Sequence, residues 1–178
     1  MPAVLNDAPE LTPGQRQAVE LVLTTRDRFV SIQGYVGVGK TTQFQAVLAG
    51  INALPVVQQP RVIGLAPTNR AVGEMQSAGV DAQTLASFLH EVGTILAAGE
   101  THDYHRHTLF LVDESSMIGN SDMAKAYALI AEGGGRAVMS GDEAQLQPIS
   151  PCTPFRLVQG RSAIDMAVMK EIVRQTPR

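Results

Sequence analysis

The sequence predicts an α/β protein with a mainly parallel sheet flanked by helices. Short apolar runs alternate with stretches in which apolar residues recur at the helical spacing, which is typical of parallel strands joined by crossover helices. The run at residues 109–112, Leu-Phe-Leu-Val, lacks polar alternation, as expected of a strand buried on both faces. A glycine-rich segment at residues 34–41 separates an apolar run from a helical stretch, which indicates a strand-loop-helix unit.

The elements follow from these periodicities and from their end signals. A helix is expected over residues 12–25, because Thr12, Pro13 and Gln15 form a capping pattern at its start. The other expected elements are a strand at 29–32, a helix that ends by Pro55, a strand at 61–66, a helix capped by Pro67-Thr68 that runs to Met75, a helix after Gly79 that carries Leu85, Phe88, Leu89 and Val92, a strand at 109–112, a helix that carries Met123, Tyr127 and Ile130, a strand at 136–139 and a weaker fifth strand at 164–169.

Composition predicts one folded domain. The 178 residues are 44% hydrophobic and 17% charged, as in an ordinary globular protein. No apolar stretch of about 20 residues and no leader pattern is visible, so neither membrane insertion nor export is expected. The single Cys152 excludes an internal disulfide and fits a reducing, cytoplasmic location. The net charge of −3 argues against nucleic-acid binding through bulk positive charge, so any such contact must be local.

Residues 34–41 match the pattern G-x-x-x-x-G-K-[ST], the phosphate-binding P-loop. Its glycines let backbone N–H groups turn toward phosphates, Lys40 can reach the β and γ oxygens, and the Thr41 hydroxyl can ligate Mg²⁺. A glycine-rich turn with an exposed lysine is the alternative, but the strand before and the helix after disfavour it. The loop therefore predicts a site for ATP and Mg²⁺ that comprises Gly34, Gly37, Gly39, Lys40, Thr41 and Thr42.

Carboxylates after the buried strand supply the hydrolytic chemistry. Asp113 can hold Mg²⁺, and Glu114 can orient or deprotonate the attacking water. A solvated acidic turn is the alternative. Gln145, beyond the strand at 136–139, could report loss of the γ-phosphate, although a Gly-Asp turn by itself is more often only a turn. The second carboxylate favours hydrolysis, in which water is the acceptor. A kinase instead transfers the phosphoryl group to a hydroxyl and would not need this carboxylate.

The order of these motifs resembles that of superfamily 1 helicases of the RecD-like branch. Segments 34–44, 79–90 and 126–142 further resemble the helicase region of the TraI-type relaxase-helicases of plasmid conjugation. The matching motifs are Leu11-Thr12 with Gln15 as an adenine-reading Q motif, 34–41 as motif I, 66–71 as motif Ia, 113–114 as motif II, 141–142 with Gln145-Leu146 as motif III, and 172–175 as motif IV, whose Arg174 would contact the γ-phosphate.

The resemblance implies a RecA-like P-loop fold, in which residues 1–178 form the first of two lobes of a 5′-to-3′ DNA helicase and translocase. The chain would be a fragment of a larger polypeptide, with residues 1–10 flexible and with a second lobe and a relaxase part elsewhere. Its strand at 136–139 should lie between the P-loop strand and the Asp113 strand, with Gln145 opposite Lys40. Lys40, Asp113, Glu114, Gln145 and Arg174 would carry catalysis, and single-stranded DNA would be a partner.

DNA contacts are expected after the strand at 61–66. Pro67, Thr68, Asn69 and Arg70 combine a helix N-terminus with a cation, which suits a backbone phosphate, and Thr84 joins them through the resemblance. The alternative is a helix cap with a solvated arginine. Many relatives carry a histidine where this chain has Ala86, so a base-stacking or phosphate contact from that histidine is not expected here. Few stacking platforms are available, because only 4% of the residues are aromatic, so we expect weak single-strand binding.

Two other interpretations stay open at this point. The chain could be a helicase-like binding module for single-stranded DNA or for recognition by the conjugative secretion machinery, or a different P-loop NTPase such as a kinase. His102, His105 and His107 suggest a metal site, but their spacing fits no familiar zinc pattern, so residues 97–107 are expected to form a solvated surface loop.

Overall fold

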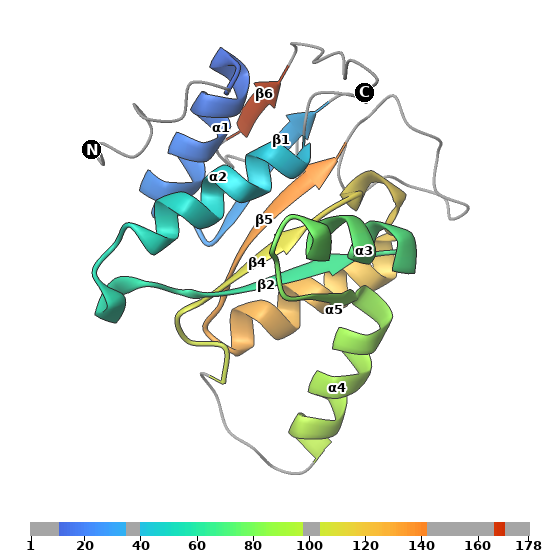
Figure 1. The fold of residues 1–178 in the computed structure, drawn as a ribbon. Coiled ribbons are helices and arrows are strands. Elements are labelled where there is room, and N and C mark those ends of the chain that lie inside the picture. The colour runs from blue at the N-terminus through green and yellow to red at the C-terminus, as the bar shows by residue number, and fades with distance from the viewer. Residues whose placement is uncertain (1–10, 35–39, 98–103, 142–165, 170–178) are drawn as a thin grey trace.

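The described residues contain six strands, which form one parallel sheet in the order β3-β2-β4-β5-β1-β6 (Figure 1). The structure is a computed structural model that describes residues 11–34, 40–97, 104–141 and 166–169. All strand pairings within these residues are parallel, which confirms the predicted class. The strands are β1 (Phe29–Gly34), β2 (Arg61–Ala66), β3 (Ala82–Thr84), β4 (Thr108–Val112), β5 (Arg136–Gly141) and β6 (Met166–Met169).

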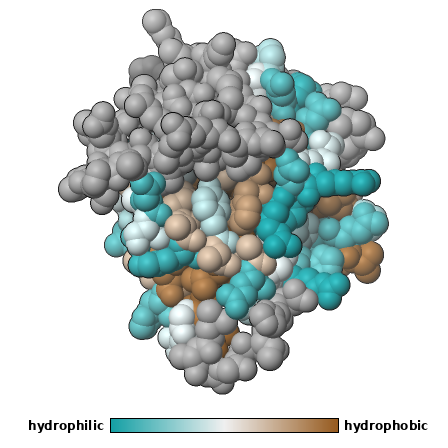
Figure 2. Space-filling model, turned by 180° about the vertical axis from the view of Figure 1, so that it is seen from behind, coloured by the Kyte–Doolittle hydropathy of each residue, from teal (hydrophilic) through white to brown (hydrophobic). Residues whose placement is uncertain are grey.

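Helices cover both faces of this sheet, and two apolar clusters fill the layers between. One cluster joins α1, α2 and α3 to the sheet, and the other joins α4 and α5 to the opposite face. Figure 2 shows this second side, where apolar side chains gather on the lower part of the molecule. The helices are α1 (Pro13–Thr24), α2 (Lys40–Asn52), α3 (Asn69–Ser77), α4 (Leu85–Ala97) and α5 (Asn120–Glu132), with 3-10 turns η2 (Val56–Gln58) and η3 (Ser115–Met117).

Strand β4 explains why its sequence lacks polar alternation. Successive side chains of a strand point to opposite faces. Leu109 and Leu111 pack in the cluster with α1 to α3, whereas Phe110 and Val112 pack in the cluster with α4 and α5. All residues of β4 are buried, so both faces demand apolar side chains.

The start of α1 follows the predicted capping pattern. The Gln15 N–H donates to Thr12 Oγ1 at 3.3 Å, and the Thr12 N–H donates to Gln15 Oε1 at 2.9 Å. Pro13 occupies the first helical position, where its missing N–H leaves no intrahelical bond unmade. The helix therefore begins within one residue of the sequence-based boundary.

Strand order confirms one expectation, and β6 confirms another. β5 lies between β4 and β1, so the strand that follows α5 separates the Asp113 strand from the P-loop strand. The weak apolar run at 164–169 forms β6 at residues 166–169, paired with β1. Because β3 precedes it, this run is the sixth strand and not the fifth.

Two sequence expectations were wrong. No strand was expected after Gly79, yet β3 pairs with β2 at the sheet edge before α4 begins at Leu85. Three residues are too few to show a period, and this strand exists through its pairing with a neighbour. The solvated loop at 97–107 was wrong for His105, whose ring is half buried and packs 4.9 Å from Phe110 between ring centroids.

Within the described ranges, no helix is long and apolar enough to cross a membrane.

Candidate nucleotide and nucleic-acid site

The P-loop sequence lies between the end of strand β1 and the start of helix α2. β1 ends at Gly34 and α2 begins at Lys40, while Gly37 and Gly39 lie outside the described residues. Ligand phosphates bind where parallel strands end and helices begin, since the backbone N–H groups of the first helical turn lack intrahelical acceptors. Thr41 and Thr42 occupy that first turn of α2. A strand before residues 35–39 and a helix after them are therefore present in the order that the P-loop motif requires.

Asp113 lies directly beyond β4, on the sheet face that carries α2. It continues the alternation of Leu109 and Leu111, both of which pack in the cluster with α1 to α3. Its N–H donates to the Leu65 carbonyl at 2.9 Å, and the residue is only 5% exposed. A carboxylate this buried requires partners that compensate its charge. Carboxylate oxygens are ligands that Mg²⁺ prefers, so a metal site beside a P-loop would suit Asp113.

Glu114 has a left-handed backbone, with φ 49° and ψ 34°. For a residue other than glycine this conformation costs roughly 1–2 kcal/mol, and such costs concentrate at functional sites. The Glu114 carbonyl accepts the Met117 N–H at 2.8 Å, which closes the η3 turn. The strand β4 therefore ends at this turn, immediately before Asp113 and Glu114.

Buried hydroxyls connect this turn to β5. The Ser115 hydroxyl donates to the Ser140 carbonyl at 2.9 Å, although these residues are 25 positions apart in the sequence. The Oγ atoms of Ser116 and Ser140 and the Oε1 atom of Gln43 in α2 are buried and have no hydrogen-bond partner among the described residues. Such atoms are costly unless a polar group reaches them.

Sequence reasoning missed this buried polar set. The two serines directly after Asp113-Glu114 were the available signal, because hydroxyls are uncommon where an apolar strand leads into a buried turn. Gln43 offered no signal of its own. Gln145 and Arg174 lie outside the described residues, so the expected pairing of Gln145 with Lys40 stays a prediction.

The Q-motif glutamine is part of the α1 cap. Gln15 is only 1% exposed, and its Oε1 accepts the Thr12 N–H. Any reading of adenine by Gln15 would therefore use a side chain whose carbonyl oxygen already caps a helix.

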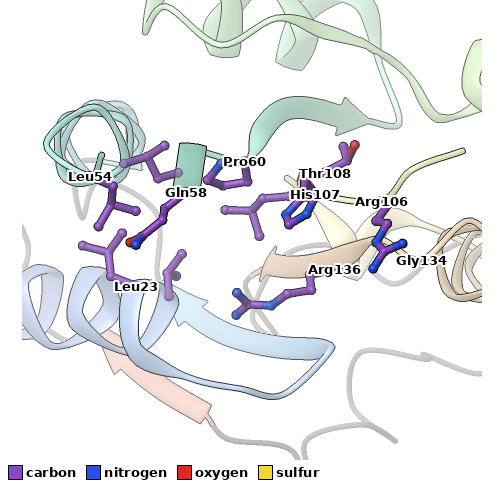
Figure 3. Close-up of a pocket in the computed structure, with 12 residues that line it drawn as sticks. Leu23, Leu54, Gln58, Pro60, Arg106, His107, Thr108, Gly134 and Arg136 are labelled. Atoms are coloured by element: carbon purple, nitrogen blue, oxygen red, sulfur yellow. The ribbon is translucent and has the colours of Figure 1, made fainter. Parts of the chain in front are cut away.

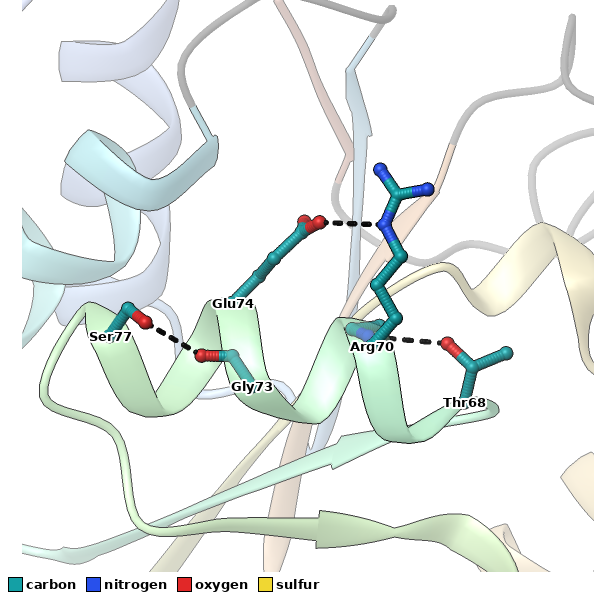
Figure 4. Close-up of polar contacts among 6 residues, drawn as sticks. Thr68, Arg70, Gly73, Glu74 and Ser77 are labelled. Atoms are coloured by element: carbon teal, nitrogen blue, oxygen red, sulfur yellow. Dashed lines mark hydrogen bonds and ion pairs between the residues drawn. The ribbon is translucent and has the colours of Figure 1, made fainter.

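The DNA candidates lie at the same edge of the sheet, where β2 ends and α3 begins (Figure 4). Thr68 Oγ1 accepts the Ala71 N–H at 3.2 Å and so caps α3. The Arg70 Nε lies 3.1 Å from Glu74 Oε1, yet 89% of the arginine side chain is exposed. Asn69 is exposed as well. A helix N-terminus beside an exposed guanidinium can hold a phosphate.

Thr84 caps the next helix. Its Oγ1 accepts the Ser87 N–H at 3.1 Å at the start of α4. A cavity of about 370 Å³ lies beside it, between the start of α4 and the η3 turn, and Pro67, Ala86 and the partly exposed Met117 contribute to its lining. This cavity connects the end of β2 to the turn after Asp113.

The histidines stay separate from this edge. His105 belongs to an aromatic cluster, His107 is exposed at the other end of β4, and His102 lies outside the described residues. Within the described part of the chain, no group of His, Cys, Asp and Glu side chains is arranged to hold a metal ion without further ligands.

Comparisons with known proteins agree with this geometry. A family model described as an AAA domain matches residues 10–178. The multifunctional conjugation protein TraI of Escherichia coli strain K12 is 66% identical over 168 residues, which cover 94% of this chain and 10% of that protein. The probable conjugal transfer protein TraA of Sinorhizobium fredii is 31% identical over 166 residues, 93% of this chain and 14% of that protein.

A solved structure described as the basis of DNA unwinding at forked DNA by two coordinating Pif1 helicases has the same fold. Its TM-score is 0.59 at 20% identity, over 94% of this chain and 45% of that one. The chain therefore has the RecA-like P-loop fold. It spans about a tenth of the curated TraI relative and about a seventh of the curated TraA relative. The family model covers residues 10–178, nearly the whole chain, so this chain belongs to the AAA domain family.

Proposed function

We propose that this chain is the ATP-binding lobe of an ATP-dependent DNA helicase, a 5′-to-3′ single-strand translocase that acts in plasmid conjugative DNA transfer in the cytoplasm. The observation that carries the proposal is the position of Asp113 and Glu114. The buried Asp113 follows β4 on the sheet face of the P-loop helix α2, and the left-handed Glu114 is the next residue in the chain. The high identity to a conjugation protein supports the biological setting.

In the proposed mechanism the nucleotide lies over the start of α2. Lys40 would pair with the β and γ phosphates, and Thr41 and Asp113 would hold Mg²⁺. Glu114 deprotonates or orients the attacking water. Gln145 senses the γ-phosphate, and Arg174 stabilises the charge of the transition state. An arginine in that role accelerates phosphoryl transfer by roughly 10³–10⁵.

DNA would bind along the same sheet edge. Thr68, Asn69 and Arg70 supply a helix N-terminus and an exposed cation, and the cavity beside Pro67 and Met117 supplies an apolar surface. These groups suit a single strand held without sequence preference. Other partners in this proposal are a second RecA-like lobe, a relaxase part of the same polypeptide, and the conjugative secretion machinery.

The decisive test is a calorimetric titration of the 178-residue chain with Mg²⁺-ATP beside the Lys40→Ala variant. We expect saturable binding that Lys40→Ala abolishes, with little turnover because a second lobe is needed for catalysis. Asp113→Asn should weaken binding mainly when Mg²⁺ is present, which distinguishes the metal ligand from the phosphate ligand. Robust DNA-stimulated hydrolysis by this chain alone would contradict the need for a second lobe.

A helicase-like binding module is the competing function. It predicts no nucleotide binding by the wild type, together with binding of single-stranded DNA that Lys40→Ala leaves unchanged. Arg70→Ala should then weaken DNA binding under both hypotheses, so the nucleotide titration is the measurement that separates them.

A further inference from the structure

Glu114 lies between two hydrogen bonds that reach the strands on either side of β4. The sheet order places β2 on one side of β4 and β5 on the other. One residue before Glu114, the Asp113 N–H donates to the Leu65 carbonyl of β2 at 2.9 Å. One residue after it, the Ser115 hydroxyl donates to the Ser140 carbonyl of β5 at 2.9 Å. The turn that carries Glu114 is therefore attached to both neighbouring strands.

The bond to β5 lies just beyond the point where the ladder between β4 and β5 ends. These two strands run side by side from the pocket drawn in Figure 3, whose lining includes Arg136 at the start of β5. Their last register pair is Val112 with Met139, so the Ser140 carbonyl follows one residue after the ladder. Ser140 is only 2% exposed, and a carbonyl in such a place needs a donor from the protein. The Ser115 hydroxyl supplies that donor.

The two bonds make different demands on the sequence. The bond from Asp113 joins two main-chain groups, so any residue other than proline could make it. The bond at position 115 requires a side-chain donor, and the fully buried Ser115 is out of reach of solvent. Alanine at this position would fit the same space and lose the donor. The attachment of the turn to β5 therefore depends on one side chain.

Glu114 requires such an attachment because of its backbone. Its φ of 49° and ψ of 34° lie in the left-handed region, which costs free energy for a residue that has a Cβ atom. A conformation of this kind persists where the surrounding structure imposes it. The Met117 N–H donates to the Glu114 carbonyl at 2.8 Å, which closes η3 within itself. The hydroxyl of Ser115 adds the connection from this turn to the sheet.

We propose that Ser115 is a positioning residue for Glu114. This inference rests on the proposed function, in which the Glu114 carboxylate orients or deprotonates the attacking water. The Ser115 hydroxyl holds the left-handed turn against β5, and the turn sets where the carboxylate lies relative to the γ-phosphate. A displacement of a reacting group by about 1 Å can cost roughly 100-fold in rate, so the placement of this turn matters for hydrolysis. Ser115 itself contacts neither the nucleotide nor the water in this scheme.

The first test measures the Glu114 backbone by nuclear magnetic resonance of the isotope-labelled 178-residue chain. The Overhauser effect between the N–H and Hα protons of one residue is strongest for a left-handed backbone. We expect this signature at Glu114 in the wild type and its loss in Ser115→Ala. Ser116→Ala is the matched control, because it removes the adjacent buried hydroxyl, which has no hydrogen-bond partner among the described residues, and should keep the signature.

The second test separates positioning from stability. Addition of Mg²⁺ with a non-hydrolysable ATP analogue should shift the carboxyl-carbon resonance of Glu114 in the wild type. This shift should be lost in Ser115→Ala, whereas the affinity for the analogue should stay near that of the wild type, because the P-loop binds the phosphates. Circular dichroism verifies that each variant is folded. If Ser115→Ala does not fold, Ser115→Cys keeps a side chain of similar size with a weaker donor and should reduce the shift.

Three results would overturn the positioning role. They are a left-handed signature and a nucleotide-induced shift that both survive in Ser115→Ala, an equal loss of the signature in Ser116→Ala, and a wild type whose Glu114 resonance does not move when the analogue binds. A wild type that binds no nucleotide, in the titration beside Lys40→Ala, would instead refute the proposed function, and the role of Ser115 would fall with it. The titration therefore distinguishes the two failures.

Discussion

The His105 imidazole lies between three aromatic rings. The ring centroids of Tyr104, Phe110 and Phe88 lie 4.5, 4.9 and 5.6 Å from its own. Its Nε2 atom is buried and has no hydrogen-bond partner among the described residues. Burial lowers the pKa of His105 below its usual 6.5, and Arg61 acts in the same direction, while Glu91 opposes them.

Folding stability should therefore depend on the protonation of His105. Because the pKa of His105 is lower in the folded state, the unfolded chain binds more protons as the pH falls below about 6.5, so stability is lost across the interval down to the lowered folded pKa. The effect should be at or below about 1 kcal/mol, because His105 is only partly buried and water still screens its charge. Urea midpoints measured between pH 7.5 and pH 5 should fall more steeply for wild type than for His105→Phe.

The matched control is His90→Phe on the exposed face of α4. This variant should keep the pH dependence of the wild type. If His105→Phe also kept it, the buried imidazole would not be its source.

Helix α1 depends on a cap that sequence and structure both specify. Thr12 and Gln15 satisfy each other's backbone donors, and Ala18, Val19 and Val22 then place the helix on the sheet. Four N–H groups at a helix start lack intrahelical acceptors, so loss of the cap leaves a donor unsatisfied and destabilises the helix. The same residues form the expected Q motif, which places the stability of α1 and its proposed nucleotide contact on one pair of side chains.

Thr12→Ala should destabilise the chain by about 1 kcal/mol, because the Gln15 N–H loses its acceptor. Thermal unfolding by circular dichroism measures this loss. Thr24→Ala at the other end of α1 is the comparison: its hydroxyl donates to the Glu20 carbonyl within the helix at 2.8 Å and caps no free N–H group, so the expected change is smaller. Equal losses of stability for both variants would show that the Thr12 cap contributes no more than the hydroxyl of Thr24.

The molecule as a whole is a sheet with an apolar layer on each face, and β4 belongs to both layers. Phe110 is fully buried and lies 5.2 Å from Phe88 between ring centroids. Tyr127 reports on the same layer, since its hydroxyl donates to the Met139 sulfur and burial raises its pKa to about 12. A substitution in this layer should therefore also affect the packing on the other face, because both layers pack on β4.

Phe110→Ala should lower the free energy of unfolding by about 3–5 kcal/mol, the usual cost of a phenylalanine-sized cavity. Tyrosine fluorescence and far-ultraviolet circular dichroism should shift together in urea, because the two layers share one strand. Val57→Ala, at an 89% exposed position, should change stability by less than about 0.5 kcal/mol. Separate transitions for the two probes would mean that the layers unfold independently.

The sequence by itself determined the class of fold and the chemistry of its motifs. Apolar periodicity, the Thr12 cap and the P-loop are local patterns, so the elements from α1 to β5 could be predicted to within a few residues, apart from β3. The motif resemblance also predicted that β5 lies between β4 and β1. Apart from this strand order, which only the resemblance supplied, these features depend on residues that are close in the chain.

Only the tertiary structure decided what depends on contacts between distant segments. β3 forms because β2 offers it a partner, and His105 is buried because Phe88 and Phe110 approach it from α4 and β4. The face on which Asp113 lies and the left-handed turn at Glu114 likewise arise from packing. Burial and register are properties of the assembled sheet, so no local pattern could have fixed them.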